Sequence, residues 1–437
     1  MLNSKKFTVA IASIAVIVVA CGGSVATPSA APIVATPSTP PVVASASPAV
    51  ASASPAVASA AAPVVDIAAI TASGPTFSAM AGLKDLTAAG KGLVGVILPD
   101  VTTSARYAAY DAPYLTSAFT AAGYTAAQFK IDNAQGTSST QLTIAQADIT
   151  AGATVLLVDP IDSVVGNQIQ ALAAQSGVKM ISYDRATFQG TNTYYVSFDN
   201  VKVGKNIGQG FMDCVTAWGV KTPKVFTLNG GQDVDPNAID FAKGYNSVIW
   251  GKSETPLPVG TTNSAGFTLV GDQVTPNWVN ATGGTIFTQA YTANKAINAT
   301  VEANDGLANA VIVALKAAGV PAKKIPTVGQ DATIQGMENI LQNFQCGSVY
   351  KPIYLEAQGA VALATYLRAG QTPPSGLVNG KTTDPKNAAS VQPAVLLDSY
   401  WVTAANMEAT VIKDKAVSVT DLCAAVTAAV CTAAGIK

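Results

Sequence analysis

Charged and amide side chains follow the apolar runs of this chain at the points where those runs end. Residues 178–185 read VKMISYDR, so an acid and a base, Asp184 and Arg185, stand together after a strand-like segment. Other runs end in PD, DP, FDN, NGG, GDQ, AND, GQD and YKP. Carboxylates accept hydrogen bonds, guanidinium and ammonium groups donate them, and amides do both. Gathered in one place, side chains of these types would form a binding site for a polar ligand.

The segments that position these side chains alternate between strand-like and helix-like patterns. The runs LVGVILPD (93–100) and ATVLLVDP (153–160) are each followed by a helix-like stretch and then by another apolar run. This alternation predicts a parallel sheet covered by helices on both faces. The chain holds too many such runs for one sheet, so we expect two similar α/β lobes. Ligands bind beyond the carboxyl ends of strands in open α/β sheets, so facing lobes would share one polar cleft.

Asp, Asn and Gly after a strand are also ordinary helix caps and turn residues, and for each position taken singly this alternative stays open. The adjacent pair Asp184 and Arg185 places a stricter requirement on the backbone. Neighbours on a regular strand point to opposite faces, so Asp184 and Arg185 can both reach one cleft only if the strand stops at about Tyr183. Their opposite charges would also lessen the cost of removing either from water.

Composition excludes several classes of function. The chain has 437 residues, a formal net charge of −1 and no histidine. The absence of histidine removes Ser-His-Asp and Cys-His catalysis, histidine metal sites and histidine pH switches. No clustered Lys/Arg face indicates nucleic-acid binding. We expect no metal and no cofactor.

The N-terminal segment is typical of an export signal. Lys5 and Lys6 precede an apolar run of fourteen residues, 7–20, which is short for a membrane span but suits a signal peptide. The sequence VVAC resembles a bacterial lipobox, which would leave Cys21 as the lipid-modified first residue and anchor the protein to a membrane. An ordinary signal peptide that contains a cysteine is the alternative.

The stretch from Gly22 to Val65 contains no charged residue and repeats ASASPAV in tandem. It offers little apolar surface to offset the entropy of ordering it, so we interpret it as a semi-extended tether. A folded Ala-rich helix is the alternative, but the regularly spaced prolines argue against it.

Four cysteines besides Cys21 allow three disulfide pairings. Cys423 and Cys431 would lie about 12 Å apart along a continuous helix, too far for a disulfide, so pairing them requires a break in the tail. We favour Cys214–Cys346 with Cys423–Cys431, and buried free thiols are the alternative.

From about residue 93 to 412 the chain resembles the periplasmic sugar-binding proteins of ABC importers, of the type I fold, and in particular the D-xylose-binding proteins. The motifs that carry this resemblance, in order, are SYDR (182–185), VSFDNVKVG (196–204), GGQDVDPNA (230–238), GDQVTPNW (271–278), EAND (302–305), GQDA (329–332) and VYKPI (349–353). It implies two doubly wound parallel-sheet lobes joined by three crossovers, near Asn200, Tyr350–Lys351 and Leu396–Asp398.

The domain boundaries that we expect combine this resemblance with the composition. A signal peptide covers 1–20 and a disordered, lipid-anchored tether covers 21–90. The N-lobe consists of 91–200 plus 352–395, and the C-lobe of 201–351 plus 396–437.

The resemblance also implies a set of sugar-binding residues. Tyr107 stands where the family has Trp, and the local alignment around it allows a shift of one residue. Trp278 matches a stacking aromatic whose apolar face would lie against the C–H surface of a sugar. Asn304 and Asp331 are also candidate helix N-caps. The full set is Arg106, Tyr107, Asp184, Arg185, Asp235, Asn237, Trp278, Asn304, Asp331 and Lys351.

The function that this resemblance implies is a monomeric extracytoplasmic lipoprotein without catalysis. It would bind a monosaccharide, with D-xylose as the first expectation, and deliver it to a permease driven by a separate ATPase. Receptors for glucose, arabinose or ribose, and a sensor that presents bound sugar to a signalling partner, are the alternatives. A transcriptional regulator would need a DNA-binding segment where this chain has an export signal. A glycoside hydrolase would need a carboxylate pair, for which Asp184, Asp235 and Asp331 are candidates.

Overall fold

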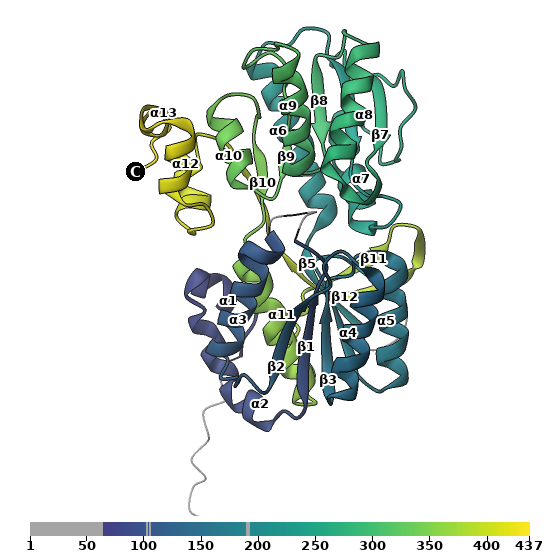
Figure 1. Cartoon of the computed structure of the whole chain (residues 1–437), viewed down its shortest axis with the longest axis vertical. Coiled ribbons are helices and arrows are strands. Elements are labelled where there is room, and N and C mark those ends of the chain that lie inside the picture. The colour runs from purple at the N-terminus through teal and green to yellow at the C-terminus, as the bar shows by residue number, and fades with distance from the viewer. Residues whose placement is uncertain (1–63, 102–103, 105, 189–192) are drawn as a thin grey trace, which may run out of the picture. The chain divides into compact units, whose positions relative to one another are not determined.

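We describe a computed structural model of the chain in residues 64–101, 104, 106–188 and 193–437. The expected signal peptide, the lipid-modified Cys21 and most of the expected tether lie outside the described residues. The described part lies in one compact unit and contains two lobes, each built around its own strands (Figure 1).

The N-lobe is built on a seven-stranded sheet of order β11-β12-β5-β4-β3-β1-β2, in which all pairs are parallel except β11–β12. Parallel neighbours need a long crossover connection, and a helix supplies it between β1 and β2, between β2 and β3, and between β3 and β4. The strands are β1 (Leu93–Leu98), β2 (Phe129–Asn133), β3 (Ala153–Val158), β4 (Lys179–Tyr183), β5 (Thr193–Phe198), β11 (Gly380–Asp384) and β12 (Asn387–Leu397).

Helices cover both faces of this sheet, as the continuous apolar runs of its strands predict. Odd and even positions of one strand point to opposite faces. In β3, Val155 and Leu157 pack toward α3 (Ala112–Ala121) and α11 (Ile353–Arg368), and Leu156 and Val158 pack toward α4 (Ser138–Thr150) and α5 (Ser163–Gln175). Two buried layers therefore fix the register of the sheet and the position of its carboxyl edge.

The expected tether is wrong over its last part, because residues 64–89 are folded onto the N-lobe. Helices α1 (Ile67–Ser73) and α2 (Lys84–Ala89) flank two short 3₁₀ turns, Gly74–Thr76 and Ser78–Leu83. Ile70, Met80 and Leu83 are fully buried in the core that includes α11. The composition of the tether ends at Val65, and from Asp66, which caps α1, the chain has enough apolar surface to fold.

The C-lobe carries two three-stranded sheets instead of one, β7-β6-β8 and β13-β10-β9. The backbone N–H of Thr300 donates to the carbonyl of Pro326 at 2.9 Å and keeps the two sheets adjacent. The strands are β6 (Lys224–Asn229), β7 (Thr268–Val274), β8 (Ala299–Glu302), β9 (Gly329–Gln330), β10 (Ser348–Tyr350) and β13 (Tyr400–Val402).

The helices of the C-lobe pack most tightly at α6 (Asn200–Ala217) and α7 (Pro236–Trp250). Glycines at the crossing make this possible: a Cβ on Gly204 would lie 2.1 Å from the carbonyl oxygen of Phe241, so no larger residue fits. The other helices are α8 (Asn280–Ala293), α9 (Asp305–Ala317) and α10 (Ile334–Leu341).

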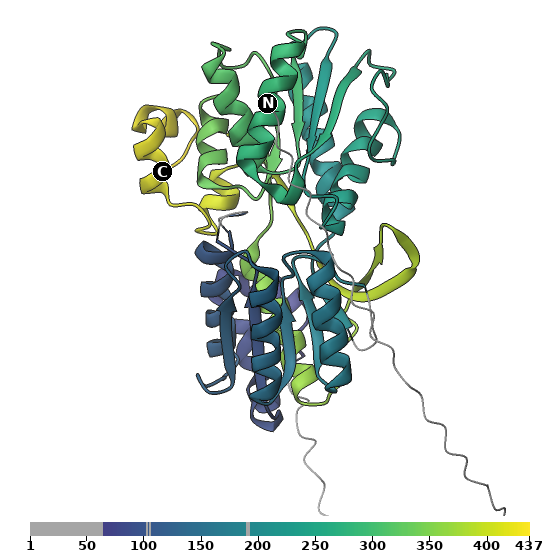
Figure 2. The ribbon, with the colours of Figure 1, turned by 45° about the vertical axis from the view of Figure 1, so that its right-hand side comes forward.

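The chain crosses between the lobes at three places within the described residues: after β5, after β10 and after β12. These places match the crossovers near Asn200, Tyr350–Lys351 and Leu396–Asp398 that the motifs implied. The hairpin β11–β12 extends from the edge of the N-lobe sheet (yellow-green in Figure 2), and its turn contacts α7, where Lys243 Nζ donates to the carbonyl of Pro385 at 3.5 Å.

Two disulfides join the four described cysteines in the favoured pairing, Cys214–Cys346 and Cys423–Cys431. The first ties α6 to the segment before β10. The second joins α12 (Val419–Val426) to α13 (Ala428–Ala433), which are separated at Thr427, where φ is 93°. This interruption is the break that the spacing of these two cysteines requires, and it brings their Cα atoms to 5.8 Å.

The two disulfides are expected to contribute unequally to stability, because they close loops of very different length. Their sequence separations are 132 and 8 residues. By loop entropy alone, Cys214→Ala with Cys346→Ala should lower the free energy of unfolding by about 5 kcal/mol, and Cys423→Ala with Cys431→Ala by about 2.5 kcal/mol. Guanidinium unfolding of the two double variants measures this difference, and equal losses would contradict it.

Candidate functional site

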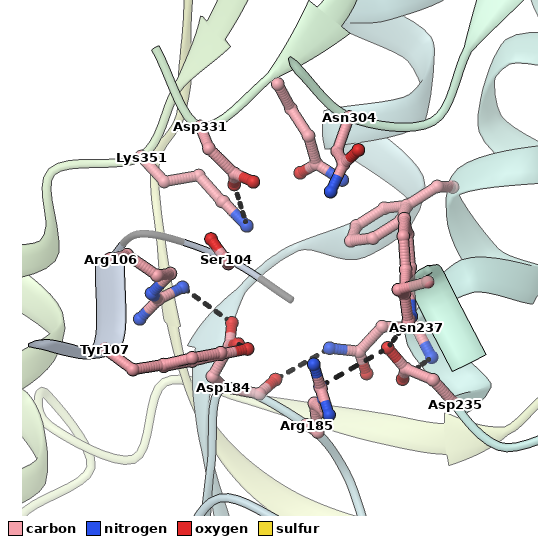
Figure 3. Close-up of a pocket in the computed structure, with 13 residues that line it drawn as sticks. Ser104, Arg106, Tyr107, Asp184, Arg185, Asp235, Asn237, Asn304, Asp331 and Lys351 are labelled. Carbon is pink, nitrogen blue, oxygen red and sulfur yellow. Dashed lines mark hydrogen bonds and ion pairs between the residues drawn. The ribbon is translucent and has the colours of Figure 1, made fainter. Parts of the chain in front are cut away.

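One cavity between the lobes brings together all ten residues that the motifs singled out (Figure 3). It holds about 370 Å³ of empty space, a figure that includes open solvent. The lining residues are Ser104, Arg106, Tyr107, Asp184, Arg185, Asp235, Asn237, Phe241, Trp278, Asn304, Gln330, Asp331 and Lys351.

Strand β4 ends at Tyr183, so the prediction that Asp184 and Arg185 lie in the loop beyond the strand is confirmed. The backbone N–H of Arg185 donates to the carbonyl of Tyr183 at 2.6 Å, which closes a γ-turn around Asp184 with φ 56°. The backbone N–H of Asp184 donates to the carbonyl of Val196 at 3.0 Å and fixes this turn to β5. The turn lets two adjacent side chains reach one cavity.

Arg106 is bound by three carboxylates at the N-lobe side of the cavity. Its guanidinium donates to Asp184 Oδ1 at 2.7 Å, to both oxygens of Asp111 at 2.9 and 2.7 Å, and to Glu356 Oε2 at 2.5 Å. All four side chains are buried. Burial raises the pKa of Glu356 to about 8, against the lowering effect of Arg106. Arg106 is thus held rigidly, with Asp184 as the partner that lines the cavity.

Asp184 keeps a lowered pKa although burial alone would raise it, because Arg106, Lys351 and Arg185 all stabilise its charged form. The hydroxyl of Tyr107 donates to Asp184 Oδ2 at 3.0 Å. The Tyr107 ring lies between two guanidinium carbons, those of Arg106 and Arg185, each 5.6 Å from its centroid. Asp184 therefore presents an ionised, acceptor-only carboxylate to the cavity.

Arg185 lies between two carboxylates that are both outside hydrogen-bond distance of its Nε, Asp159 at 3.9 Å and Asp235 at 3.8 Å. Its Nη1 donates to the carbonyls of Pro160 and Ile161 at 3.3 and 3.1 Å. Burial raises the pKa of the Asp159 carboxyl, with the nearby Asp184 as the next cause. The backbone carbonyls of Pro160 and Ile161 therefore orient the guanidinium at the edge of the cavity.

The start of α7 supplies two lining residues from the C-lobe. Asp235 is the N-cap of this helix and accepts from the backbone N–H of Asn237 at 2.9 Å. Asn237 Nδ2 donates to the carbonyl of Asp184 at 2.7 Å across the two lobes. The pKa of Asp235 is raised by burial, although Arg185 opposes the shift. The N-terminus of α7 in the C-lobe is thus hydrogen-bonded to the turn at Asp184 in the N-lobe.

Trp278 forms an aromatic wall and is 6% exposed. Its indole N–H donates to Asp235 Oδ2 at 3.1 Å, and its ring is tilted 68° from that of Phe241, with centroids 6.4 Å apart. Gly230 makes room for it, because a Cβ there would lie 2.1 Å from Trp278 Cη2.

Asp331 and Lys351 form an ion pair of 2.9 Å between Oδ1 and Nζ, with both side chains at least nine-tenths buried. The charges of Asp331 and Asp184 raise the pKa of Lys351, although burial lowers it. Asn304 is the N-cap of α9 and uses Oδ1 to accept from Leu307 N at 2.9 Å. Asp331 caps no helix, since Thr333 is the N-cap of α10.

Three lining residues were not predicted: Ser104, Phe241 and Gln330. Phe241 follows Asn237 by four residues on α7, a spacing that places both on one face of a helix. Gln330 precedes Asp331 in the GQD motif. Its Nε2 donates to the carbonyl of Ala303 at 2.9 Å, and its buried Oε1 has no hydrogen-bond partner among the described residues. Ser104 had no signal beyond its proximity to Arg106.

The arrangement can bind a small uncharged polar ligand. Three carboxylates accept, three cations donate, amides do both, and the rings of Tyr107, Phe241 and Trp278 supply apolar surface. The described residues contain no group of three or more Cys, Asp or Glu arranged to hold a metal ion.

Two α/β lobes, joined by three crossovers and enclosing a polar cleft, define the class of type I periplasmic binding proteins. The model of the periplasmic binding protein domain family matches residues 94–372. A D-xylose-binding periplasmic protein of Escherichia coli K12 is 33% identical over 65% of this chain and 80% of its own length. The multiple sugar-binding periplasmic receptor ChvE of Rhizobium radiobacter is 30% identical over 75% of this chain and 91% of its own.

A solved carbohydrate transporter solute-binding protein of Chloroflexus aurantiacus, in complex with D-glucose, is 25% identical, with a TM-score of 0.63 over 76% of this chain and 98% of its own. The resemblance drawn from the motifs is confirmed: the chain belongs to the type I periplasmic sugar-binding proteins. Members of this family serve ABC-type transport as substrate-binding proteins and not as enzymes. Within the described part of the chain, no helix is long and apolar enough to cross a membrane.

Replacing Gly230 by Ala should displace Trp278, because the added Cβ overlaps the indole ring. We expect a loss of about 1–3 kcal/mol in the free energy of unfolding and a changed near-UV circular dichroism spectrum. Gly284→Ala in α8 is the comparison: its Cβ would lie 3.3 Å from Ala310 Cβ, a tight contact that a shift of a few tenths of an ångström relieves, and we expect a much smaller change. An unaltered near-UV spectrum of Gly230→Ala would contradict the packing described.

Proposed function

We propose that this protein is the extracytoplasmic receptor of an ABC importer for a monosaccharide, with D-xylose as the ligand. The observation that carries the proposal is the convergence of all ten expected residues on one buried cavity. They come from segments as distant in sequence as Arg106 and Lys351, so their proximity in sequence does not explain why they share a cavity.

The chemistry of the cavity suits a pentose. Each sugar hydroxyl both donates and accepts, so carboxylates and cations are needed together. The carboxylates of Asp184, Asp235 and Asp331 would accept hydrogen bonds from the sugar hydroxyls. The cations Arg106, Arg185 and Lys351 would donate hydrogen bonds to hydroxyl and ring oxygens. Trp278 and Phe241 would lie against the C–H surface of the sugar. Charge-assisted hydrogen bonds are stronger than neutral ones.

Support for D-xylose comes from the relatives. Two curated proteins that are 33% and 32% identical are named D-xylose-binding, whereas those at 30% and 29% are named multiple sugar-binding. A site that pairs every hydroxyl disfavours an analogue that leaves a buried partner unpaired. We therefore place xylose first and treat glucose, arabinose and ribose as competitors to be tested.

Capture of the sugar would follow from closure of the lobes about the three crossovers. Two contacts already join the lobes beside the cavity: Asn237 Nδ2 to the carbonyl of Asp184, and both the backbone N–H and the hydroxyl of Ser163 to the carbonyl of Val234, at 2.9 and 2.7 Å. Closure removes water from the charged groups and strengthens their hydrogen bonds to the ligand. Opening would release the sugar unchanged to the permease.

We further propose that the mature protein is lipid-anchored through Cys21. The basic start, the short apolar run and VVAC support this, and the Ala/Pro/Ser-rich stretch that follows would keep the receptor near its permease. Mass spectrometry of the membrane fraction should find a diacylated Cys21, and Cys21→Ser should abolish that modification. Recovery of an unmodified, soluble chain would reject the anchor.

Calorimetric titration of residues 22–437 should show D-xylose binding with a Kd of about 1 μM, near −8 kcal/mol. Glucose, arabinose, ribose and galactose should bind more weakly. No heat and no thermal stabilisation with any of these sugars would reject the proposed function. Tighter binding of another sugar would replace xylose as the ligand.

The variants Asp331→Ala and Trp278→Ala should each weaken sugar binding by about 100-fold or more, because each leaves a buried partner unsatisfied or an aromatic wall missing. Glu254→Ala, which alters an exposed acid away from the cavity, is the matched control and should bind as the unaltered chain does. Circular dichroism checks that the variants are folded. Unchanged affinity in both cavity variants would show that the site lies elsewhere.

A further inference from the structure

Asp305 is a fully buried carboxylate next to the cavity, and its side chain does not line it. Both of its oxygens are used. Oδ1 accepts from Ser348 Oγ and Gln345 Nε2, each at 2.8 Å, and Oδ2 accepts from the backbone N–H and the hydroxyl of Thr333, at 2.8 and 3.1 Å. One side chain therefore joins the loop after β9 to the start of β10.

The loop that Asp305 holds has an unfavourable backbone conformation. Asp331 and Ala332 are consecutive non-glycine residues with φ of 92° and 47°. Such conformations persist only where the surroundings over-determine them. Three successive N–H groups are fixed: Asp331 N donates to the carbonyl of Val349, Ala332 N to Ser348 Oγ, and Thr333 N to Asp305 Oδ2. The last two depend on Asp305 directly or through Ser348.

Two glycines allow the carboxylate to lie this close to the backbone. A Cβ on Gly329 would be 2.3 Å from Asp305 Oδ1, and one on Gly336 would be 2.2 Å from Oδ2.

Both oxygens must be able to accept. Burial raises the pKa of Asp305 to about 7, and its hydrogen bonds to Ser348 and Gln345 oppose this. In the protonated form the O–H can donate to the Ser348 hydroxyl, which both donates and accepts, so the loop stays held. An asparagine has one NH₂ group in place of one of these oxygens. In the position of Oδ1 the NH₂ would face the Nε2 donor of Gln345, and in the position of Oδ2 it would face the Thr333 N–H donor.

We propose that Asp305 is a positioning residue for ligand binding, which holds the strained Asp331–Ala332 loop and the start of β10 so that Asp331 and Lys351 meet in the cavity. Ser348, its partner, lies three residues before Lys351, and Asp331 lies two residues before Thr333. The inference rests on the proposed function, because it assigns Asp305 a role in presenting the sugar-binding pair.

The test compares Asp305→Asn with Glu302→Gln, a matched control. Glu302 is also fully buried and ends β8, but its Oε2 accepts from Val328 N at 3.0 Å and does not contact the loop. Calorimetry with D-xylose should show affinity about 10-fold or more weaker for Asp305→Asn and unchanged for Glu302→Gln. In an Asp331→Asn background, Asp305→Asn should cost less affinity than in the unaltered chain, since part of its effect acts through Asp331.

Amide hydrogen exchange in the sugar-free protein gives a readout that does not depend on any ligand. The amides of Ala332 and Thr333 should exchange about 10-fold faster in Asp305→Asn, while the strands of the N-lobe keep their protection. If Asp305→Asn fails to fold, Ser348→Ala takes its place in this experiment. It is a milder change that removes one hydroxyl, and it should show the same local effect. Faster exchange throughout both lobes would indicate a general loss of stability and would overturn the positioning role.

The outcomes separate the two proposals. If the unaltered chain binds none of the sugars, the proposed function fails, and the exchange of Ala332 and Thr333 alone decides whether Asp305 holds the loop. If the unaltered chain binds and Asp305→Asn binds equally well with unchanged exchange, Asp305 has no positioning role.

Discussion

The pairing of Arg106 with three carboxylates is the interaction on which the binding cleft depends. A buried guanidinium is tolerable only if its charge and its donors are satisfied, and Asp111, Asp184 and Glu356 do this from three separate segments. The bonds join the first loop of the N-lobe to the end of β4 and to α11, which follows the second crossover. Loss of Arg106 would leave these buried acids without the cation that they share. The position of Asp184, and with it the turn that presents Arg185, therefore follows from this cluster.

The sequence predicted most of what depends on local pattern. The end of β4 at Tyr183 followed from the alternation of side chains along a strand, which is a property of five or six residues. The break between Cys423 and Cys431 followed from the rise of a helix. The identity of the lining residues came from motifs in a fixed order, which the fold brings to the carboxyl edges of the strands. In each case the information lies in neighbouring residues or in a preserved order.

The groups that hold the lining residues in place were not predicted, because their role depends on contacts between distant segments. Glu356 lies within α11, where a single acid in a helix is usually interpreted as solvent-exposed. Asp305 is the first residue of α9, where an acid is usually interpreted as part of the helix N-terminus. Phe241 reads as an ordinary core residue of α7. The folded segment 67–89 was assigned to the tether because its own apolar pattern is weak, and its burial depends on α11, which lies nearly 300 residues later.

The lining of the cavity carries three acids and three bases, so its formal charges cancel. Buried acids behind the lining, Asp111, Asp159 and Glu356, lie against these bases, so the surroundings of the cavity hold more acids than bases. A neutral sugar gains nothing from long-range attraction to this charge. The rate at which a sugar enters is therefore set by diffusion and by opening of the lobes, and it should depend little on the salinity outside the cell.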